Sequence, residues 1–428
     1  MFCRQCGKEL EEGRKFCASC GAEQEPAGAA GAAAGGALQS STSQTDAPSP
    51  GGTGGMKTVR IVIIAVVALL VLAGAGVGIY FGVRNTSSNK PESTGSSTTG
   101  KKIVIPEVRS EKLAYINGKD IYTIGLNGAG EKKVTSRGDI VDFVAAPDGS
   151  RIAFVAATGD QRVIFMMRPD GSGLSQVTLP EKGLAQYPAF DPTGKYIYFT
   201  RLTPEDQANI EAARPFGIGF ERYDIAANKV DHLYTNSGMQ EESIEGLFAD
   251  PSGGALYFNR FGSDWPSSIP YRLSLGPPAS ASVYMPMQTD TGKYTAVAFQ
   301  LTGFSRTGTY VSYFKTALLV EQNQQTGPQQ EVDACFKHAS SGDETIVATY
   351  EPTDTRQGEV SGMEFSRVAN ATYYFSKVQS TGPNATSLAL DFYKGSSGGT
   401  AAPTGLSVSV SVEPQEYTPM VWHLLAVQ

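Results

Sequence analysis

Four cysteines near the N-terminus are the residues of this chain best suited to chemistry. They form two Cys-x-x-Cys pairs, and a glycine follows each pair. Each pair brings two thiolates to one side of a tight turn, so two pairs supply the four soft ligands of a tetrahedral Zn²⁺ site. Because four sulfurs leave no position open for water, we expect the metal to be structural and not catalytic. The predicted ligands are Cys3, Cys6, Cys17 and Cys20.

A disulfide pair and a redox Cys-x-x-Cys motif are the alternatives for these cysteines. A redox motif occurs singly beside a βαβ pattern, which is absent here. The segment 1–23 is too short to build a core unaided, so metal binding should fold it. It resembles the short N-terminal zinc ribbon of many prokaryotic membrane proteins, which implies a small docking or assembly module. Its basic and acidic residues balance, which argues against nucleic-acid binding.

The rest of the chain offers little catalytic chemistry. No two of its three histidines are paired at metal-ligand spacing, and no Gly-x-Ser-x-Gly motif occurs. Ser312 and Lys315 match the Ser-x-x-Lys sequence pattern, but they lie in a strand-like run, so we expect no catalytic role for them. Aspartates recur at turns, where capping explains them better than calcium binding. We therefore expect no enzyme, and a buried strand position for Cys335. The histidines are His232, His338 and His423, and the turn aspartates are Asp148, Asp170, Asp191 and Asp250.

An uncharged apolar run over 61–83 is long enough to cross a membrane. As a helix it would span roughly 34 Å, against about 30 Å of hydrocarbon. The sequence that precedes it is too long for a cleaved signal peptide, and a core helix would show a polar stripe. We predict an uncleaved signal-anchor helix over 59–83 in the cell membrane. The glycines at 74, 78 and 82 share one helix face, so a homodimer through this helix is an alternative to a monomer.

Cysteine chemistry predicts the orientation of this helix. The charges that flank it are too even for a strong positive-inside signal. Closely spaced thiolates persist in a reducing cytosol, whereas the large domain has one cysteine and needs no such shelter. We expect a cytoplasmic N-terminus and an extracytoplasmic C-terminal domain.

The region beyond residue 106 repeats itself. The run 121–135 matches 164–178 at a constant offset, including two glycines and a Val-Thr pair. A second motif interleaves with it, in which a Pro-Asp-Gly or Asp-Pro-x-Gly turn leads into an alternating strand. A β repeat of about 40–50 residues is the size of one four-stranded propeller blade. The glycines of the second motif are Gly149, Gly194 and Gly253, with weaker copies at Gly292 and Gly342.

These runs resemble the TolB-type propeller repeat over about 107–260. The resemblance implies an all-β fold with six blades. Seven blades are the alternative, because 363–428 offers further strands, and a tandem of immunoglobulin-like sandwiches is the alternative fold. We expect the final run, 421–427, to complete a blade and close the ring.

Composition then divides the 428 residues into five regions. The formal net charge of −7 arises in the last of them, since the first 60 residues are balanced and the spacer is basic. An acidic domain disfavours DNA, RNA and anionic lipid as partners. The regions are a zinc ribbon at 1–23, a disordered Ala/Gly/Ser/Pro linker at 24–58, the transmembrane helix at 59–83, a polar spacer at 84–106 and the β-propeller at 107–428.

The sequence predicts a membrane-anchored interaction protein. Its extracytoplasmic propeller would bind an envelope protein, a peptide or a polymer at the central channel, and its cytosolic ribbon would dock a second component. A propeller-based hydrolase or lyase acting on a glycan or peptide is one alternative, favoured by carboxylates or a histidine at the channel mouth. A transmembrane sensor is the other, disfavoured by the two long linkers.

Overall fold

The structure is a computed structural model that describes residues 108–427 apart from residue 241 and the segments 263–267, 290–295, 320–328, 354–355, 380–384 and 413–419. These residues belong to one unit of the chain, Gly95–Gln428. The predicted ribbon, both linkers and the transmembrane helix lie outside the described residues. In the described part of the chain, no helix is long and apolar enough to cross a membrane.

The described strands form six antiparallel sheets, which we number as blades in ring order. Blade 1 contains β25 (Trp422–Val427), β1 (Ser110–Asn117), β2 (Asp120–Gly125) and β3 (Lys132–Lys133). Blade 2 contains β4 (Ile140–Ala145), β5 (Ile152–Thr158), β6 (Gln161–Met167) and β7 (Ser175–Gln176). Blade 3 contains β8 (Leu184–Phe190), β9 (Tyr196–Leu202), β10 (Phe216–Asp224) and β11 (Lys229–Met239).

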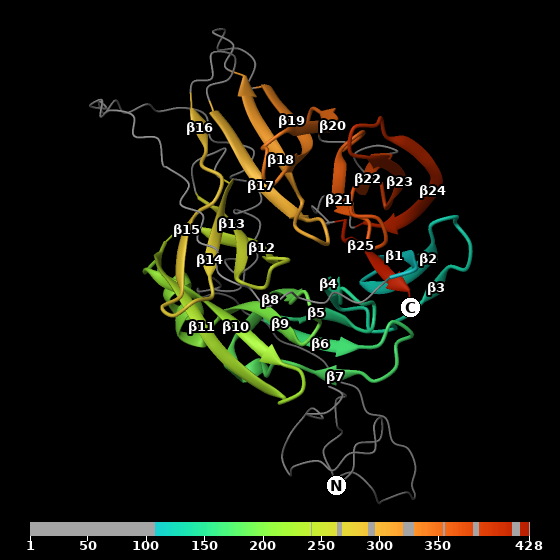
Figure 1. Cartoon of the computed structure of the whole chain (residues 1–428). Helices are drawn as coiled ribbons and strands as arrows, with labels where there is room; N and C mark the ends of the chain where they lie inside the picture. Colours follow the sequence, from blue (N-terminus) through green and yellow to red (C-terminus); the bar gives the residue numbers. More distant parts are fainter. Residues whose placement is uncertain are drawn as a thin grey trace, which may run out of the picture. The chain divides into compact units, whose positions relative to one another are not determined.

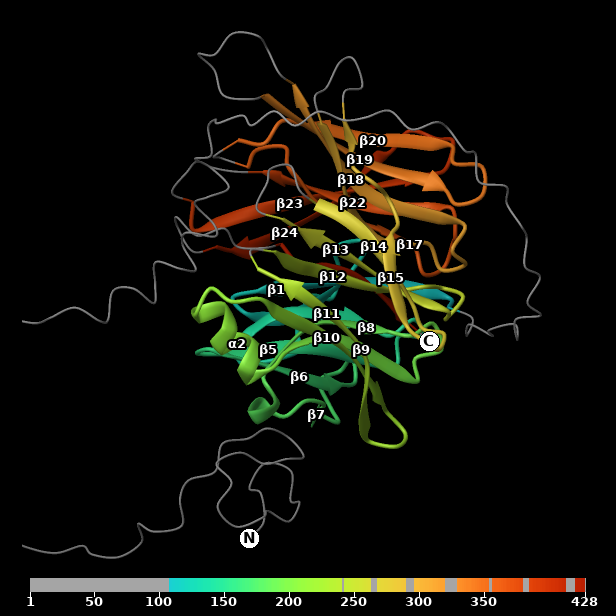
Figure 2. The ribbon, with the colours of Figure 1, turned by 90° about the vertical axis from the view of Figure 1, so that its left-hand side faces the viewer.

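Blade 4 contains β12 (Ser243–Ala249), β13 (Ala255–Phe261), β14 (Ser268–Ser274) and β15 (Ser280–Val283). Blade 5 contains β16 (Gln288–Thr289), β17 (Ala296–Phe304), β18 (Tyr310–Leu319), β19 (Gln329–His338) and β20 (Glu344–Tyr350). Blade 6 contains β21 (Val360–Phe365), β22 (Thr372–Gln379), β23 (Ser387–Ser396) and β24 (Ala402–Ser411). The helices are η1 (Pro180–Lys182) and α2 (Pro204–Glu211), and α2 lies outside the ring beside blade 3 (Figure 2).

The blades stand around a common axis, with the strands β4, β8, β12, β17, β21 and β25 nearest the centre (Figure 1). This arrangement confirms the predicted six-bladed propeller. It excludes both alternatives for the described residues: they form six sheets and not seven, and the sheets pack in a ring and not in the facing pairs of a sandwich tandem.

Neighbouring blades pack against each other through apolar side chains on both faces of each sheet. Phe220 of blade 3 packs on Phe258 of blade 4 with ring centroids 4.8 Å apart. Phe336 of blade 5 packs on Tyr373 of blade 6 at 5.1 Å. A sheet covered on both faces buries successive residues and not only alternate ones. This explains why the first five residues of β5 are all buried.

The last strand closes the ring. β25 pairs with β1 in antiparallel register from Ser110–Val427 to Tyr115–Trp422, so the two ends of the propeller sequence share one blade (Figure 1). Trp422 also donates a hydrogen bond from its indole nitrogen to the Ser376 hydroxyl of blade 6, at 2.8 Å. The predicted closure by 421–427 is confirmed.

The repeated Val-Thr pair has a specific role in the blades. The Thr135 hydroxyl accepts the backbone N–H of Ile121 at 2.9 Å, and the Thr178 hydroxyl accepts that of Ile164 at the same distance. Each threonine thus satisfies a backbone donor of the third strand at the point where the short fourth strand begins to leave it.

The turn motif is confirmed in three copies and wrong in one. Gly149, Gly194 and Gly253 lie at positive φ in the turns that join the first two strands of blades 2, 3 and 4. Gly342 instead lies between the outer strands β19 and β20, and Gly292 lies outside the described residues. The equivalent turn of blade 5 is 305–308, where the Gly308 N–H bonds to the Ser305 carbonyl at 2.8 Å.

A substitution in the first of these turns can test how the ring is closed. A Cβ at Gly149 would lie 1.9 Å from the Ala426 carbonyl oxygen of β25, whereas a Cβ at Gly159 would meet nothing within 4 Å. Both glycines have positive φ, at 71° and 58°, so alanine strains the backbone at either position. We expect Gly149→Ala to lower the free energy of unfolding by about 2 kcal/mol more than Gly159→Ala, because only Gly149 abuts the closing strand. Urea unfolding of the two full-length variants measures this difference, and equal losses would contradict it.

Candidate functional site

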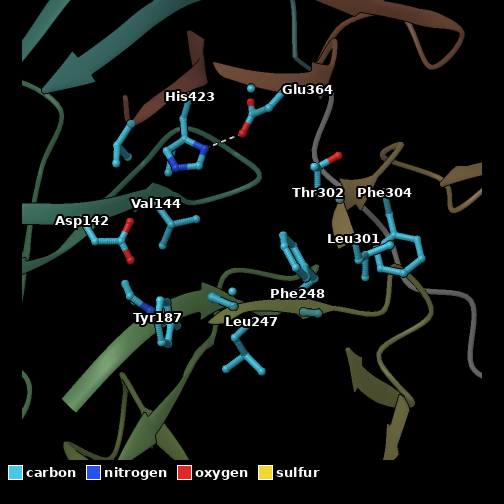
Figure 3. A pocket seen from close by; sticks show the side chains of 18 of the residues that line it. Asp142, Val144, Tyr187, Leu247, Phe248, Leu301, Thr302, Phe304, Glu364 and His423 are labelled. Atoms are coloured by element: carbon cyan, nitrogen blue, oxygen red, sulfur yellow. Dashed lines mark hydrogen bonds and ion pairs between the residues drawn. The ribbon is translucent and has the colours of Figure 1, made fainter. Parts of the chain in front are cut away.

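A cavity of about 840 Å³ lies in the middle of the ring. One strand of every blade contributes to its wall, and we call it the first strand of that blade: β25, β4, β8, β12, β17 and β21. In blade 5 the two-residue strand β16 precedes it in the chain. Figure 3 shows their side chains around a common space. The centre of the propeller is therefore a channel where residues far apart in the sequence meet.

Local irregularities turn side chains into this channel. The register shifts in β4, β8, β12, β17 and β21, and each shift marks a bulge or similar irregularity that re-aims nearby side chains. Tyr187 lies in the β8 irregularity at a φ of 52°, a left-handed conformation that an aromatic residue rarely adopts. Such strained residues cluster at functional sites, so Tyr187 is a functional candidate.

Asp142 follows the irregularity in β4, and its carboxylate projects toward the middle of the cavity (Figure 3). Burial raises the pKa of Asp142 from 3.8 to about 6, although a positive charge on His423 and the Phe143 N–H act in the opposite direction. The carboxylate makes no ion pair or hydrogen bond with another side chain in the described part of the chain. Its charge is therefore compensated only in part, by the Phe143 N–H and by a positive charge on His423.

Glu245 occupies a similar position in β12, next to the irregularity there. Its side chain is open to the water of the channel, yet the surrounding walls raise its pKa by burial. Burial raises the pKa of Tyr187, and the negative charges of Glu245 and Asp142 add to this effect, whereas the Arg162 charge opposes it. These four side chains, Asp142, Arg162, Tyr187 and Glu245, all line the same cavity.

His423 reaches the channel from the closing strand. Its Nδ1 is hydrogen-bonded to Glu364 of blade 6, and its ring packs edge-on against Phe143 at 4.8 Å (Figure 3). Glu364 also accepts the Leu424 N–H at 2.8 Å and lies 3.6 Å from the Arg367 guanidinium. Burial raises the pKa of Glu364, but these partners prevail and hold it below its usual value. The ionised Glu364 thus fixes the orientation of the histidine.

The opposite end of the channel has a different chemistry. The turns that follow the first strands place proline or arginine at one equivalent position in five blades, and all of these residues line the cavity. The Arg306 guanidinium donates to the Arg367 carbonyl at 3.1 Å, which links blades 5 and 6 there. Asp142 and Glu245 thus lie near the start of their strands, whereas the turns at the other end of the channel carry proline and arginine. The turn residues are Pro147, Pro192, Pro251, Arg306 and Arg367.

The predicted zinc ligands Cys3, Cys6, Cys17 and Cys20 lie outside the described residues, so their role stays a prediction. Within the described ranges, no three His, Cys, Asp or Glu side chains are close enough to hold a metal ion. Cys335 is buried in β19, as expected.

Most of the other sequence candidates have structural roles. The turn aspartates accept backbone N–H groups two residues on, as at Asp170–Ser172 and Asp250–Ser252. Lys315 pairs with Glu344 at 3.1 Å, so the Ser-x-x-Lys match is no catalytic pair. His232 bonds to Glu221 of its own blade, and His338 caps a turn. His423 alone of the three histidines lines the cavity.

Sequence reasoning missed Asp142, Tyr187 and Glu245. The available signal was weak: Asp142 and Glu245 are single acidic residues inside otherwise largely apolar strands that precede a repeat turn. Nothing in the sequence shows that these strands line one channel.

Comparison with known proteins supports the ribbon and the repeats. A family model for a zinc-ribbon domain matches residues 2–24, which confirms the predicted ribbon. The Tol-Pal system protein TolB of Geobacter sulfurreducens is 33% identical over 75 residues. These residues make up 18% of this chain and 17% of that protein, so the chain matches only a small part of this curated relative.

Solved structures with a similar arrangement include TolB from Acinetobacter baumannii, at 17% identity and a TM-score of 0.47 over 72% of this chain and 67% of that one. A prolyl endopeptidase has 11% identity and a TM-score of 0.44 over 71% and 51%. An oligogalacturonate lyase in complex with manganese has 10% identity and a TM-score of 0.38 over 69% and 85%.

The raised pKa of Asp142 predicts a pH-dependent stability. An acid whose pKa is higher in the folded than in the unfolded state lowers the free energy of unfolding above its folded pKa, and this effect vanishes below its unfolded pKa. We expect Asp142→Asn to be more stable than the parent chain by about 1–3 kcal/mol at pH 8, with the difference fading between pH 6 and pH 4. Thermal unfolding of the full-length chain across this range measures it. The exposed Asp160→Asn is the matched control, and a pH-independent difference at Asp142 would contradict the prediction.

Proposed function

We propose that this chain is a membrane-anchored interaction protein whose propeller binds a segment of a partner in its central channel. The partner is an envelope protein, peptide or polymer, met on the extracytoplasmic side. The helix at 59–83 anchors the chain in the membrane, and the ribbon docks a second component in the cytoplasm. The observation that carries this proposal is the cavity of about 840 Å³, in which Asp142 and Glu245 have no side-chain partner among the described residues.

The geometry of the channel favours binding over a purely structural role. An interior that only stabilised the ring would be filled by packed apolar side chains. This one is hollow and presents aromatic surface from Phe248 and Phe304 (Figure 3). It also carries Asp142 and Glu245, which have no side-chain partner in the part of the chain that the structure describes. Concave surfaces with a few convergent polar groups are the usual form of ligand sites.

Photo-crosslinking in intact cells tests this function. Val144 projects into the channel, whereas Val283 is half-exposed on the outer strand of blade 4 (Figure 3). We expect a photoreactive residue at 144 in the full-length chain to capture one discrete partner band, because the partner segment lies within reach. The same residue at 283 should capture none. Equal capture at the two positions, or capture at 283 alone, would reject the channel as the binding site.

A hydrolase or lyase is the second candidate, favoured by the Glu364–His423 pair facing Asp142. A histidine oriented by a carboxylate is a common general base. The same crosslinking separates the two functions. An enzyme turns its substrate over, so His423→Gln should retain more captured material than the parent chain, whereas a binding module should retain the same amount or less.

We further propose that the ribbon holds one structural Zn²⁺ through Cys3, Cys6, Cys17 and Cys20. The family match at 2–24 supports the fold that such a site requires. We expect one zinc per purified full-length chain by elemental analysis, and loss of most of it in Cys17→Ser. Cys335→Ser is the control, because that cysteine is buried in the propeller. Zinc retained in Cys17→Ser would reject the assignment.

A further inference from the structure

Three neighbouring blades place a distinct group of side chains at one sector of the channel. Asp142 comes from β4, Tyr187 from β8 and Glu245 from β12, which are the first strands of blades 2, 3 and 4. Each residue lies at or next to a register shift of its strand. The tyrosine therefore stands between the two carboxylates along the wall, and both charges act on its hydroxyl.

Asp142, which is partly buried in the channel wall, departs from the way this protein pairs its buried acids. Asp120 is 4% exposed and has Lys133 at 3.0 Å, with Thr135 and two backbone N–H groups as further partners. Asp333 is 8% exposed and accepts the Thr349 hydroxyl at 2.6 Å. Buried polar groups in folded proteins are paired in this way almost without exception.

Asp142 and Glu245 have no such side-chain partner in the described part of the chain. Asp142 is partly buried in the wall and Glu245 is exposed to the channel, so a group that enters the cavity can reach both carboxylates. Burial raises the pKa of both groups, so their ionised forms are less well solvated here than in water. A cation delivered by a ligand would supply what is missing, and it would be held in a partly desolvated space where charge-assisted hydrogen bonds are strong.

The other charged side chains that face this sector already have hydrogen-bond or ion-pair partners. Glu364 is committed to His423, Arg367 and the Leu424 N–H. Arg162 of β6 donates to the carbonyls of Gly159 and Gln161, at 3.4 and 3.1 Å. The protein's own cations therefore leave both carboxylates available.

We propose that this sector is a subsite for the side chain of a lysine or arginine in the partner segment. The ammonium or guanidinium group binds between Asp142 and Glu245, and the aliphatic stem packs along the Tyr187 ring. The inference rests on the proposed function and names the chemistry of the partner. A metal ion is disfavoured, because no third ligating side chain is close enough in the described ranges.

Binding of defined peptides to the full-length chain tests the subsite. The probes are acetylated and amidated pentapeptides of alanine with lysine, arginine, norleucine or glutamate at the centre, followed by calorimetry at pH 8. We expect the lysine and arginine peptides to bind at least about tenfold more tightly than the norleucine peptide, which has the same stem without the charge. The glutamate peptide should bind most weakly.

The double variant Asp142→Asn, Glu245→Gln removes both charges and keeps the shapes. It should lose the tenfold preference, while Glu211→Gln on the exposed helix α2 should keep it. In the parent chain the preference should also weaken below about pH 6, because Asp142 is then protonated and loses its charge.

The outcomes separate this inference from the proposed function. A norleucine peptide that binds as tightly as the lysine peptide, no measurable binding of any peptide, or a preference that survives in the double variant would each overturn the subsite. Crosslinking at 144 could still capture a partner in those cases, which would leave the binding function standing. A charge preference without capture at 144 would support the subsite and reject the proposed partner site.

Discussion

The pairing of β25 with β1 is the constraint on which the rest of the structure depends. Each blade has two apolar faces and buries both only if a blade stands on either side. An open row of six blades would leave two faces and two strand edges uncovered, and such edges are prone to aggregate. The C-terminal strand prevents this by completing blade 1, and Trp422 adds a contact to blade 6. The last residues of the chain therefore determine the stability of the whole ring.

The pairing of β25 with β1 also encloses the channel and places a histidine in its wall. β25 lines the cavity with the first strands of the other blades, so the element that closes the ring also brings His423 to the centre. Glu364 joins the same two blades, since it accepts the Leu424 N–H and orients the histidine. Stability and function are thus coupled in one strand, and damage to its pairing would disturb both.

The charge pattern of the channel gives the propeller a direction. Asp142 and Glu245 lie where the first strands begin, and Arg306 and Arg367 lie in the turns where such strands end. An extended ligand would therefore meet different chemistry at its two ends, which favours one orientation of binding. This asymmetry agrees with the proposed binding function, in which a partner segment would enter the channel in one orientation.

Sequence and tertiary structure determined different parts of this protein. The zinc ribbon could be read from the sequence because its information is local: four cysteines at fixed spacing, each pair followed by glycine. The blades were also predictable from local information. Gly149, Gly194 and Gly253 adopt a positive φ in short turns, and each turn lies within a few residues of the two strands that it joins. Blade 5 escaped detection because its turn carries serine and arginine where others carry aspartate and proline.

The channel site was decided by the tertiary structure alone. Asp142, Tyr187 and Glu245 lie on three different blades, and only the closed ring brings them to one wall. Their direction depends on irregularities in the strands, and a shift of one residue sends a side chain to the other face of a sheet. A sequence of alternating residues does not show where such a shift occurs. The sequence therefore determined the blade repeat, whereas the packing of the blades in the closed ring decided that there are six and which polar residues face the channel.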